Sequence, residues 1–423
     1  MKSIFSIVAI IGLCPFLAWG RGVSAENRVA QTTETVLEQF LADRAIPRYD
    51  VDSVQFFQSG ADKFESLLRD MASAKHHIHC EYFIFANDSI GHRIIDMMKL
   101  KARQGVECRL LVDGYYDKKR GYRYDKRIKL LRMHGIEVCV YAPYEFPYAH
   151  RVLRDHRKIV VIDGHIGYTG GFNVADYNIK GKPGIYGGYV DTHVRLEGQV
   201  VEGLQFLFAN HFEHSGGSRF EGNAYYPYTA AHYAHRRGSA EACIVERSHH
   251  IYPKKMEMRR AVVKLIDEAR DSLHITSPYL LPIPSVRRAI RRAQKRGVHV
   301  EILFSEEGDT PLFDVGNLSY AHRLHRRGAE VWLYRDAFQH SKILTVDGRC
   351  SLVGSVNLDS RAMRWNEEVA ALIFDEASAR WLDSTFVENQ RKAHRLTDEY
   401  YENLPFSKRM KGFFANYFLS WCL

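Results

Sequence analysis

One pattern of residues that could perform nucleophilic and acid–base chemistry occurs twice in the chain. In each copy a lysine, an aspartate, a glycine and an asparagine follow a histidine by 2, 7, 14 and 17 residues. The first copy is His156, Lys158, Asp163, Gly170 and Asn173, and the second is His340, Lys342, Asp347, Gly354 and Asn357. Agreement at five positions, with an apolar run between lysine and aspartate in both copies, indicates a duplicated site.

The paired motifs contain the groups needed to transfer a phosphoryl-type group. Because side chains alternate along a strand, the histidine and lysine of each copy should project from one face. Two copies facing each other would gather two imidazoles, two ammonium groups and two carboxamides, and the lysines and asparagines would bind the oxygens of a phosphodiester. One histidine would attack phosphorus, while the other would protonate the leaving oxygen and then deprotonate an alcohol or water. The lysines supply the charge that a metal would bring, and no metal-ligand spacing is present, so we expect neither a metal nor a cofactor.

Four acidic residues complete the candidate site. A catalytic imidazole needs an acceptor on its far nitrogen. Asp191 and Glu368 follow their histidines by 35 and 28 residues and are the candidates for this orienting role. Asp163 and Asp347 are grouped with the catalytic residues as members of the motif. Since each follows a strand and precedes a glycine, we expect them to fix that turn rather than to contact substrate.

The elements around the motifs repeat in the same order. Apolar strand-like runs alternate with amphipathic helices that end at a glycine, as in residues 90–103 before Gly105 and 285–295 before Gly297. The two histidines are 184 residues apart, so the repeat has the size of a domain. This order predicts an α/β protein of two duplicated lobes that face each other pseudo-symmetrically, each a mostly parallel sheet flanked by helices.

The predicted domain organisation follows from the repeat and from the composition of the ends. We expect a signal peptide or membrane anchor at 1–25, a first lobe at 26–212, an insert at 213–247, a second lobe at 248–400 and an aromatic tail at 401–423.

Composition narrows the class of partner. The 423 residues carry a formal net charge of +9, which favours a polyanionic partner, either nucleic acid or anionic lipid. Charge alone does not choose between them. Seven cysteines show no paired spacing, and Cys80, Cys108 and Cys139 lie in apolar runs, so we expect small buried side chains rather than disulfides.

The residues at both ends of the chain favour contact with a membrane. Residues 4–19 are apolar and follow Lys2, and a small-x-small sequence ends at Ala25, which is typical of an export signal. An uncleaved anchor is the alternative, and both interpretations place the body of the protein outside the cytoplasm. The tail from Lys408 combines a basic start with many aromatic residues. It would either lie in a bilayer interface or dock as a helix on its own domain.

The duplicated motif resembles that of the phospholipase D superfamily. Residues 155–173, 189–198 and 354–368, together with Ser277-Pro278-Tyr279, are similar to the bacterial cardiolipin synthase branch. The resemblance covers roughly residues 50–400. Three features depart from that branch: a single short apolar run replaces two membrane helices, Ile283-Pro284 stands where an acidic residue is usual, and the carboxyl end is an aromatic tail.

The resemblance implies a phosphatidyltransferase that makes cardiolipin through a phosphohistidine, with His156 as nucleophile and His340 as acid and base. It implies anionic phospholipid substrates such as phosphatidylglycerol, a membrane surface on the periplasmic or outer side of the cell membrane, no nucleic acid and no obligate protein partner. The near-symmetry of the motifs leaves the order of the histidines open. The rivals are a phospholipid hydrolase, an exported nuclease of the same superfamily, and a lipid-binding scaffold without activity.

Overall fold

The computed structural model describes residues 33–114, 124–141, 153–181, 188–228, 240–251 and 255–422. The expected signal or anchor at 1–25 lies outside these residues. Among the described helices, none combines the length and apolarity needed to cross a bilayer.

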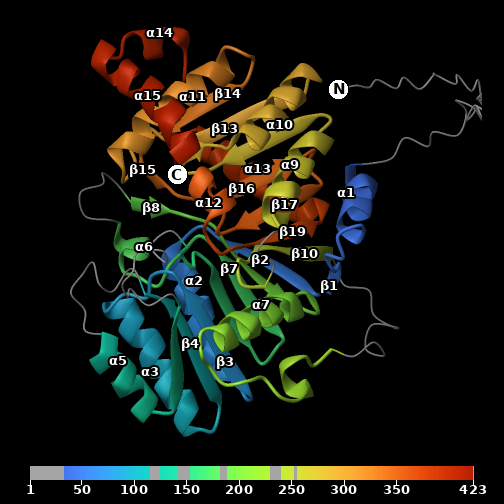
Figure 1. The fold of residues 1–423 in the computed structure, drawn as a ribbon, viewed down its shortest axis with the longest axis vertical. Helices are drawn as coiled ribbons and strands as arrows, with labels where there is room; N and C mark the ends of the chain where they lie inside the picture. Colours follow the sequence, from blue (N-terminus) through green and yellow to red (C-terminus); the bar gives the residue numbers. More distant parts are fainter. Residues whose placement is uncertain are drawn as a thin grey trace, which may run out of the picture.

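Two large sheets form the centres of two lobes, the first in the lower and the second in the upper half of Figure 1. In spatial order the first sheet contains β2 (Ser53–Phe57), β9 (His193–Glu197), β7 (Ile166–Gly170), β6 (Lys158–Ile162), β3 (His77–Tyr82), β4 (Glu107–Asp113) and β5 (Ile136–Tyr141). The second contains β10 (Ala240–Arg247), β19 (Glu368–Phe374), β17 (Cys350–Gly354), β16 (Ile343–Val346), β11 (Ser272–Thr276), β13 (His299–Ser305) and β14 (Glu330–Tyr334), with β1 (Tyr49–Val51) and β20 (Ala393–Arg395) at its edges. The seven shared strands follow one order, which confirms the duplicated α/β architecture.

The strand directions correct the expectation of mostly parallel sheets. In the first sheet β3, β4 and β5 are parallel, because helices connect them. The other neighbours, from β3 through β6, β7 and β9 to β2, pair antiparallel, and the second sheet repeats this division. Each sheet is therefore mixed.

Equivalent helices cover equivalent faces of the two sheets. The first lobe carries α2 (Gly60–Ser73), α3 (Ser89–Arg103), α5 (Tyr124–Met133) and α7 (Val200–His214), and the second carries α9 (Glu257–Glu268), α10 (Pro284–Lys295), α11 (Pro311–His325) and α13 (Glu376–Gln390). Helix α1 (Thr33–Ala42) packs on α9, and short helices α6 (Tyr177–Lys180), α12 (Ser360–Arg364) and α14 (Asp398–Glu402) precede the terminal α15 (Phe406–Cys422). Helix α2 illustrates why these segments form helices with one buried face. Its residues Phe64, Leu67 and Met71 recur at helical spacing and are fully buried.

One buried cluster and one pair of short strands join the two lobes. A single buried cluster includes Ile159 and Val194 of the first lobe with Val353 and Ile373 of the second. Strand β8 (Gly188–Val190) of the first lobe pairs in parallel with β15 (Ala337–Gln339) of the second, whereas β12 (Leu280–Leu281) pairs with β18 (Leu358–Asp359) inside the second lobe. Residues 240–247 of the predicted insert form β10, so this part of the insert belongs to the second sheet.

Candidate active site

Both motif histidines lie at the contact between the two lobes. His340 follows β15, and its backbone N–H donates to the carbonyl of Val190 over 2.7 Å. His156 follows Asp155, which forms an isolated parallel bridge with Glu367, and its N–H donates to the carbonyl of Glu367 over 3.0 Å. Each histidine therefore precedes the strand of its own lobe and is held by the backbone of the opposite lobe.

The carboxylates that orient the histidines are exchanged between lobes. His156 Nδ1 lies 3.1 Å from Glu368 Oε2, and His340 Nδ1 lies 2.6 Å from Asp191 Oδ2. The sequence identified both acids but associated each with the preceding histidine of its own lobe. The structure corrects that pairing. With Nδ1 occupied by a carboxylate, Nε2 is the ring atom left for chemistry.

The two orienting acids are supported differently. Glu368 accepts a hydrogen bond from Ser355 Oγ, and its other oxygen accepts one from Asn366 Nδ2 over 3.0 Å. Asp191 accepts from its neighbour Thr192 N over 2.8 Å. A Cβ at Gly171 would lie 1.9 Å from Asp191 Oδ1, so the carboxylate occupies the space of a missing side chain. The second residue of each motif's Gly-Gly or Gly-Ser step therefore meets a different acid. Gly171 leaves room for Asp191, whereas Ser355 donates a hydrogen bond to Glu368.

The two lysines are buried beside the histidines. Lys158 Nζ donates to the carbonyl of His156 over 2.6 Å, and Lys342 Nζ lies 2.7 Å from His340 Nδ1. Burial lowers the pKa of Lys158 to about 7, with Lys342 adding to the effect and Glu368 opposing it. The pKa of Lys342 is also lowered by burial, against the pull of Asp191 and Glu368. Since each motif influences the other's groups, the copies form one site.

The histidines are neutral at neutral pH. Burial lowers the pKa of His340 to about 4, reinforced by Lys342 and opposed by Asp191. Burial also lowers the pKa of His156, although the partner Glu368 acts in the other direction. Burial alone would raise the pKa of Asp191, but Lys342 and His340 hold it below its usual range. A neutral imidazole has the free electron pair that a nucleophile or base requires.

The asparagines of the two motifs are not equivalent. Asn173 Oδ1 accepts from Ile84 N over 3.2 Å, and its Nδ2 donates to the Tyr177 hydroxyl. Asn357 Oδ1 is buried and has no hydrogen-bond partner among the described residues. Because a buried polar atom without a partner is unfavourable and an amide oxygen only accepts hydrogen bonds, Asn357 Oδ1 is suited to a ligand donor such as a hydroxyl, not to a phosphate oxygen.

Asp163 and Asp347 do not belong to the site. They lie at the opposite ends of β6 and β16 from the histidines, in left-handed turns with φ of 52° and 54°. Asp163 accepts hydrogen bonds of 2.7–2.8 Å from the backbone N–H groups of residues 75–77, and Asp347 accepts hydrogen bonds of 2.8–3.1 Å from those of residues 270–272. These positions and hydrogen bonds are those of the expected turn-fixing role rather than of residues grouped with the histidines.

A buried ionic network stands behind His156. Arg157 is fully buried and lies 3.2 Å from both Glu246 and Glu367 of the second lobe, and 3.7 Å from Glu81 of its own lobe. Glu81, Asp155 and His211 come close enough to hold a cation, and the Arg157 guanidinium provides a positive charge at this position. The network therefore joins the two lobes through the residue between His156 and Lys158.

Sequence reasoning missed several residues that contact the histidines. The Phe83 and Tyr189 rings lie 5.3 Å and 5.1 Å from His156 and His340, and Tyr279 contacts His340 at 6.3 Å. Tyr279 was noted only as part of the Ser-Pro-Tyr segment. Arg157 could have been suspected because it differs from Ser341 at the equivalent place in the repeat.

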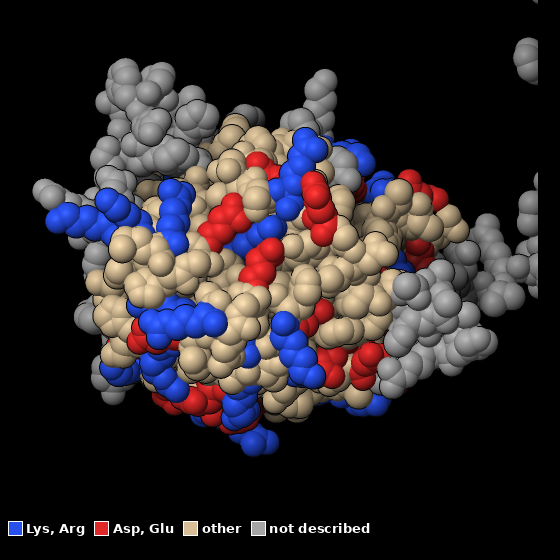
Figure 2. All heavy atoms as spheres, turned by 90° about the horizontal axis from the view of Figure 1, so that it is seen from below, with Lys and Arg blue, Asp and Glu red and all other residues tan. Residues whose placement is uncertain are grey.

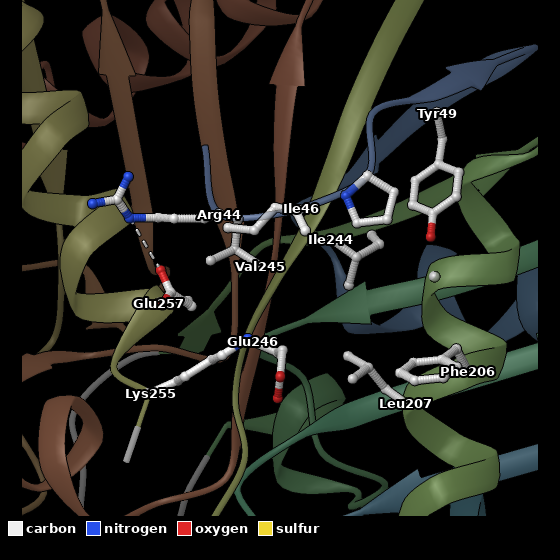
Figure 3. Close-up of a pocket in the computed structure, with 13 residues that line it drawn as sticks. Arg44, Ile46, Tyr49, Phe206, Leu207, Ile244, Val245, Glu246, Lys255 and Glu257 are labelled. Atoms are coloured by element: carbon white, nitrogen blue, oxygen red, sulfur yellow. Dashed lines mark ion pairs between the residues drawn. The ribbon is translucent and has the colours of Figure 1, made fainter. Parts of the chain in front are cut away.

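A separate pocket of about 230 Å³ lies away from the motif residues (Figure 3). Tyr49, Phe206 and Ile244 give it apolar walls, and the ion pair between Arg44 and Glu257 lies at its edge. It marks where the segment before β1 docks onto α7 and β10. Its wall residue Glu246 also pairs with Arg157, which connects the pocket to the network behind His156.

Comparisons with known proteins agree with this geometry. A family model described as cardiolipin synthase, PLD-like domain, matches residues 67–182 and 262–390. A cardiolipin synthase of Oceanobacillus iheyensis is 33% identical over 361 residues, or 85% of this chain and 73% of the relative. A probable cardiolipin synthase of Bacillus subtilis is 31% identical over 372 residues, or 86% and 71% of the two chains. The crystal structure of phosphatidylserine synthase from Haemophilus influenzae shares the fold, with a TM-score of 0.71 and 15% identity over 92% of this chain and all of that one. The crossed site and these matches place the chain in the cardiolipin synthase family of phospholipase D-like proteins.

Proposed function

We propose that the protein is a phosphatidyltransferase that makes cardiolipin from two molecules of phosphatidylglycerol and releases glycerol. The observation that carries this proposal is the pair of crossed histidine–carboxylate contacts with a buried lysine beside each. This set provides a nucleophile, an acid and two cations for one phosphodiester. The names of the relatives supply the choice of lipid.

In the first step, Nε2 of His156 attacks the phosphorus of one phospholipid. A P–N bond forms, the P–O bond to the headgroup glycerol breaks, and His340 gives a proton to the leaving oxygen. For this step His340 must be protonated, and the bound phosphate anion raises the low pKa that its burial imposes. Lys158 and Lys342 neutralise the phosphate oxygens.

In the second step, the primary hydroxyl of a second phosphatidylglycerol replaces glycerol. His340 removes the hydroxyl proton, the alcohol oxygen attacks phosphorus, and the P–N bond to His156 breaks. The product is cardiolipin, and both histidines return to their starting states. The reaction exchanges one phosphodiester for another, so it needs no external energy source.

The hydrolase and nuclease alternatives are less well supported. Relatives that match 85% of this chain are named cardiolipin synthases, and water in the second step would give phosphatidic acid instead. The face seen in Figure 2 carries basic and acidic side chains intermixed, rather than a single basic track for nucleic acid.

We further propose that catalysis occurs at the outer or periplasmic surface of the cell membrane. The apolar residues 4–19 and the sequence ending at Ala25 support export or anchoring. Their lipid substrates place the members of this family at a bilayer.

The test is incubation of the purified full chain with phosphatidylglycerol vesicles, followed by lipid analysis. The expected products are cardiolipin and glycerol in equal amounts. Phosphatidic acid without cardiolipin would contradict the transferase proposal and favour the hydrolase. Loss of both products in His156→Ala, with an unchanged unfolding transition, would tie the activity to this site.

A further inference from the structure

Helix α15 at the carboxyl end carries an unusual outward face. Five large apolar side chains recur along it at spacings of 4, 3, 1 and 3 residues: Phe406, Met410, Phe413, Phe414 and Tyr417. Their exposed fractions run from 36% for Met410 to 71% for Phe406. This spacing places all five on one stripe of the helix, and the rings of Phe413 and Tyr417 lie 5.8 Å apart.

The opposite face of α15 already accounts for how the helix docks. Gly412 is so close to α11 that a Cβ there would lie 2.4 Å from the carbonyl of Val315. Ala415 and Asn416 are buried, and Ala415 packs near Gly316. Small residues thus fix the helix on its own lobe, and the aromatic stripe contributes little to that packing. The two expectations for the tail are therefore compatible.

Helix α15 packs on elements that lead to the second-lobe half of the site. It packs on α11, on α12 and on β12, and both α15 and α11 are seen at the upper left of Figure 1. Strand β12 pairs with β18, which directly follows Asn357. Asp309 lies just before α11, and its carboxylate accepts a hydrogen bond from the hydroxyl of Tyr279. The ring of Tyr279 in turn contacts His340. A surface covering the aromatic stripe would therefore border the second-lobe half of the site.

We propose that the aromatic stripe of α15 inserts into the lipid surface from which the site draws its substrate. The helix contains Lys408, Arg409 and Lys411 and no acidic residue, so its charge complements an anionic lipid surface. Phenylalanine and tyrosine are the side chains suited to the boundary between headgroups and acyl chains. This proposal rests on the proposed phospholipid substrate, and it adds which surface of the protein meets the bilayer.

The role of α15 can be separated from that of any anchor at residues 1–32. The double variant Phe413→Ser, Phe414→Ser keeps the small docking face intact. We expect its turnover of phosphatidylglycerol in vesicles to fall at least tenfold, while its turnover of a soluble short-chain phosphatidylglycerol stays within twofold of the unmodified protein. The matched control is Leu130→Ser, Met133→Ser on α5, where two exposed apolar side chains of the first lobe are removed. It should leave both activities unchanged.

A second measurement does not depend on activity. In the unmodified full chain, backbone amides of residues 406–417 should exchange more slowly with deuterium in the presence of vesicles containing phosphatidylglycerol, and those of α5 should not. Equal losses on vesicle and soluble substrates would show a structural role and overturn the proposal, as would unchanged exchange in α15. Protection of α15 that grows with protein concentration without lipid would assign the stripe to a second copy of the chain instead. If phosphatidylglycerol is not a substrate but the amides are protected, the proposed function fails and the docking surface stands.

Discussion

The two halves of the site share histidine and lysine but differ in what stands behind them. Behind His340 the backbone is held by neutral side chains: Gln339 Oε1 accepts from Ser341 N, and Ser305 Oγ accepts from Gln339 N. Behind His156 the equivalent positions hold ionisable side chains: Asp155 Oδ1 accepts from Arg157 N, and Asp113 Oδ2 accepts from Asp155 N. The backbone hydrogen bonds are the same in both halves, so the duplication kept the geometry and changed the charge.

The difference suggests a division of labour. Arg157 ties the His156 segment to two acids of the opposite lobe, which gives that histidine a rigid ionic support. Ser341 makes only a hydroxyl contact of 2.9 Å with Thr192 across the lobes. A histidine that carries a covalent intermediate benefits from a fixed position, whereas one that gains and loses a proton does not need that support. This asymmetry fits the assignment of His156 as nucleophile.

Breaking the orienting contacts should have the largest effect. Asp191→Asn and Glu368→Gln remove the acceptor charge from His340 and His156, and each should lower turnover about a hundredfold or more, within the range of general acid–base catalysis. The crossed pairing of acids and histidines allows a more specific test. Mutation of Asp191 in the first lobe should alter the titration of His340 in the second, as followed by nuclear magnetic resonance of the ring protons. An altered His156 with an unchanged His340 would contradict it.

Removal of the ionic support should affect stability more than any change at Ser341. Arg157→Met leaves Glu81, Glu246 and Glu367 without their shared cation, and loss of one partner from a buried ion pair costs about 3–5 kcal/mol. Ser341→Ala removes one hydrogen bond, worth about 1 kcal/mol. Chemical denaturation of both variants gives the comparison, and equal losses would show that the two halves are supported alike.

The space behind Asp191 offers a steric test. Gly171→Ala would push a methyl group into the Asp191 carboxylate and tilt His340, so we expect turnover to fall about tenfold. The control is Gly188→Ala, where the new Cβ meets only Ala337 Cβ at 3.8 Å. Similar losses in both variants would mean that Asp191 tolerates displacement.

The smallest effect concerns protons taken up on binding. Because the pKa of Lys158 is about 7 in the free protein, this lysine is mostly neutral at pH 8 and mostly protonated at pH 6. A phosphodiester anion favours the charged form and raises that pKa, so a soluble non-hydrolysable lipid analogue should bind with proton uptake at pH 8 and little from Lys158 at pH 6. Calorimetry in two buffers of different ionisation enthalpy measures this uptake. It should be smaller in Lys158→Met, where the proton taken up by His340 remains, and an uptake equal to that of the unmodified protein would contradict the assignment to Lys158.

The sequence predicted the duplicated architecture and the chemically active residues because both leave local patterns. The helices predicted at residues 90–103 and 285–295 are α3 and α10, and the histidine and lysine positions follow from the repeat itself. Strand direction was not predictable in the same way. All five residues of β6 are buried, so no alternation of apolar and polar residues distinguishes its environment, and only the connections determine its direction.

The crossed contacts between acids and histidines could not be predicted from the sequence, for a different reason. Asp191 and Glu368 were found by type and distance along the chain, but which histidine each contacts depends on how β8 and β15 pair between lobes. Glu367, adjacent to Glu368, also remained unnoticed because its partner Arg157 is 210 residues away in sequence. Long-range ionic contacts of this kind leave no spacing that a single sequence can reveal.

The central claim is that His156 carries the phosphatidyl group while His340 handles the proton. The most direct test is incubation of His340→Ala with phosphatidylglycerol labelled at phosphorus, followed by rapid quenching and peptide mapping under alkaline conditions that preserve phosphohistidine. We predict label on the peptide that contains His156 and none after incubation of His156→Ala. Label on the His340 peptide in the His156→Ala protein, with none on His156 in the other variant, would contradict the account and exchange the roles of the two halves.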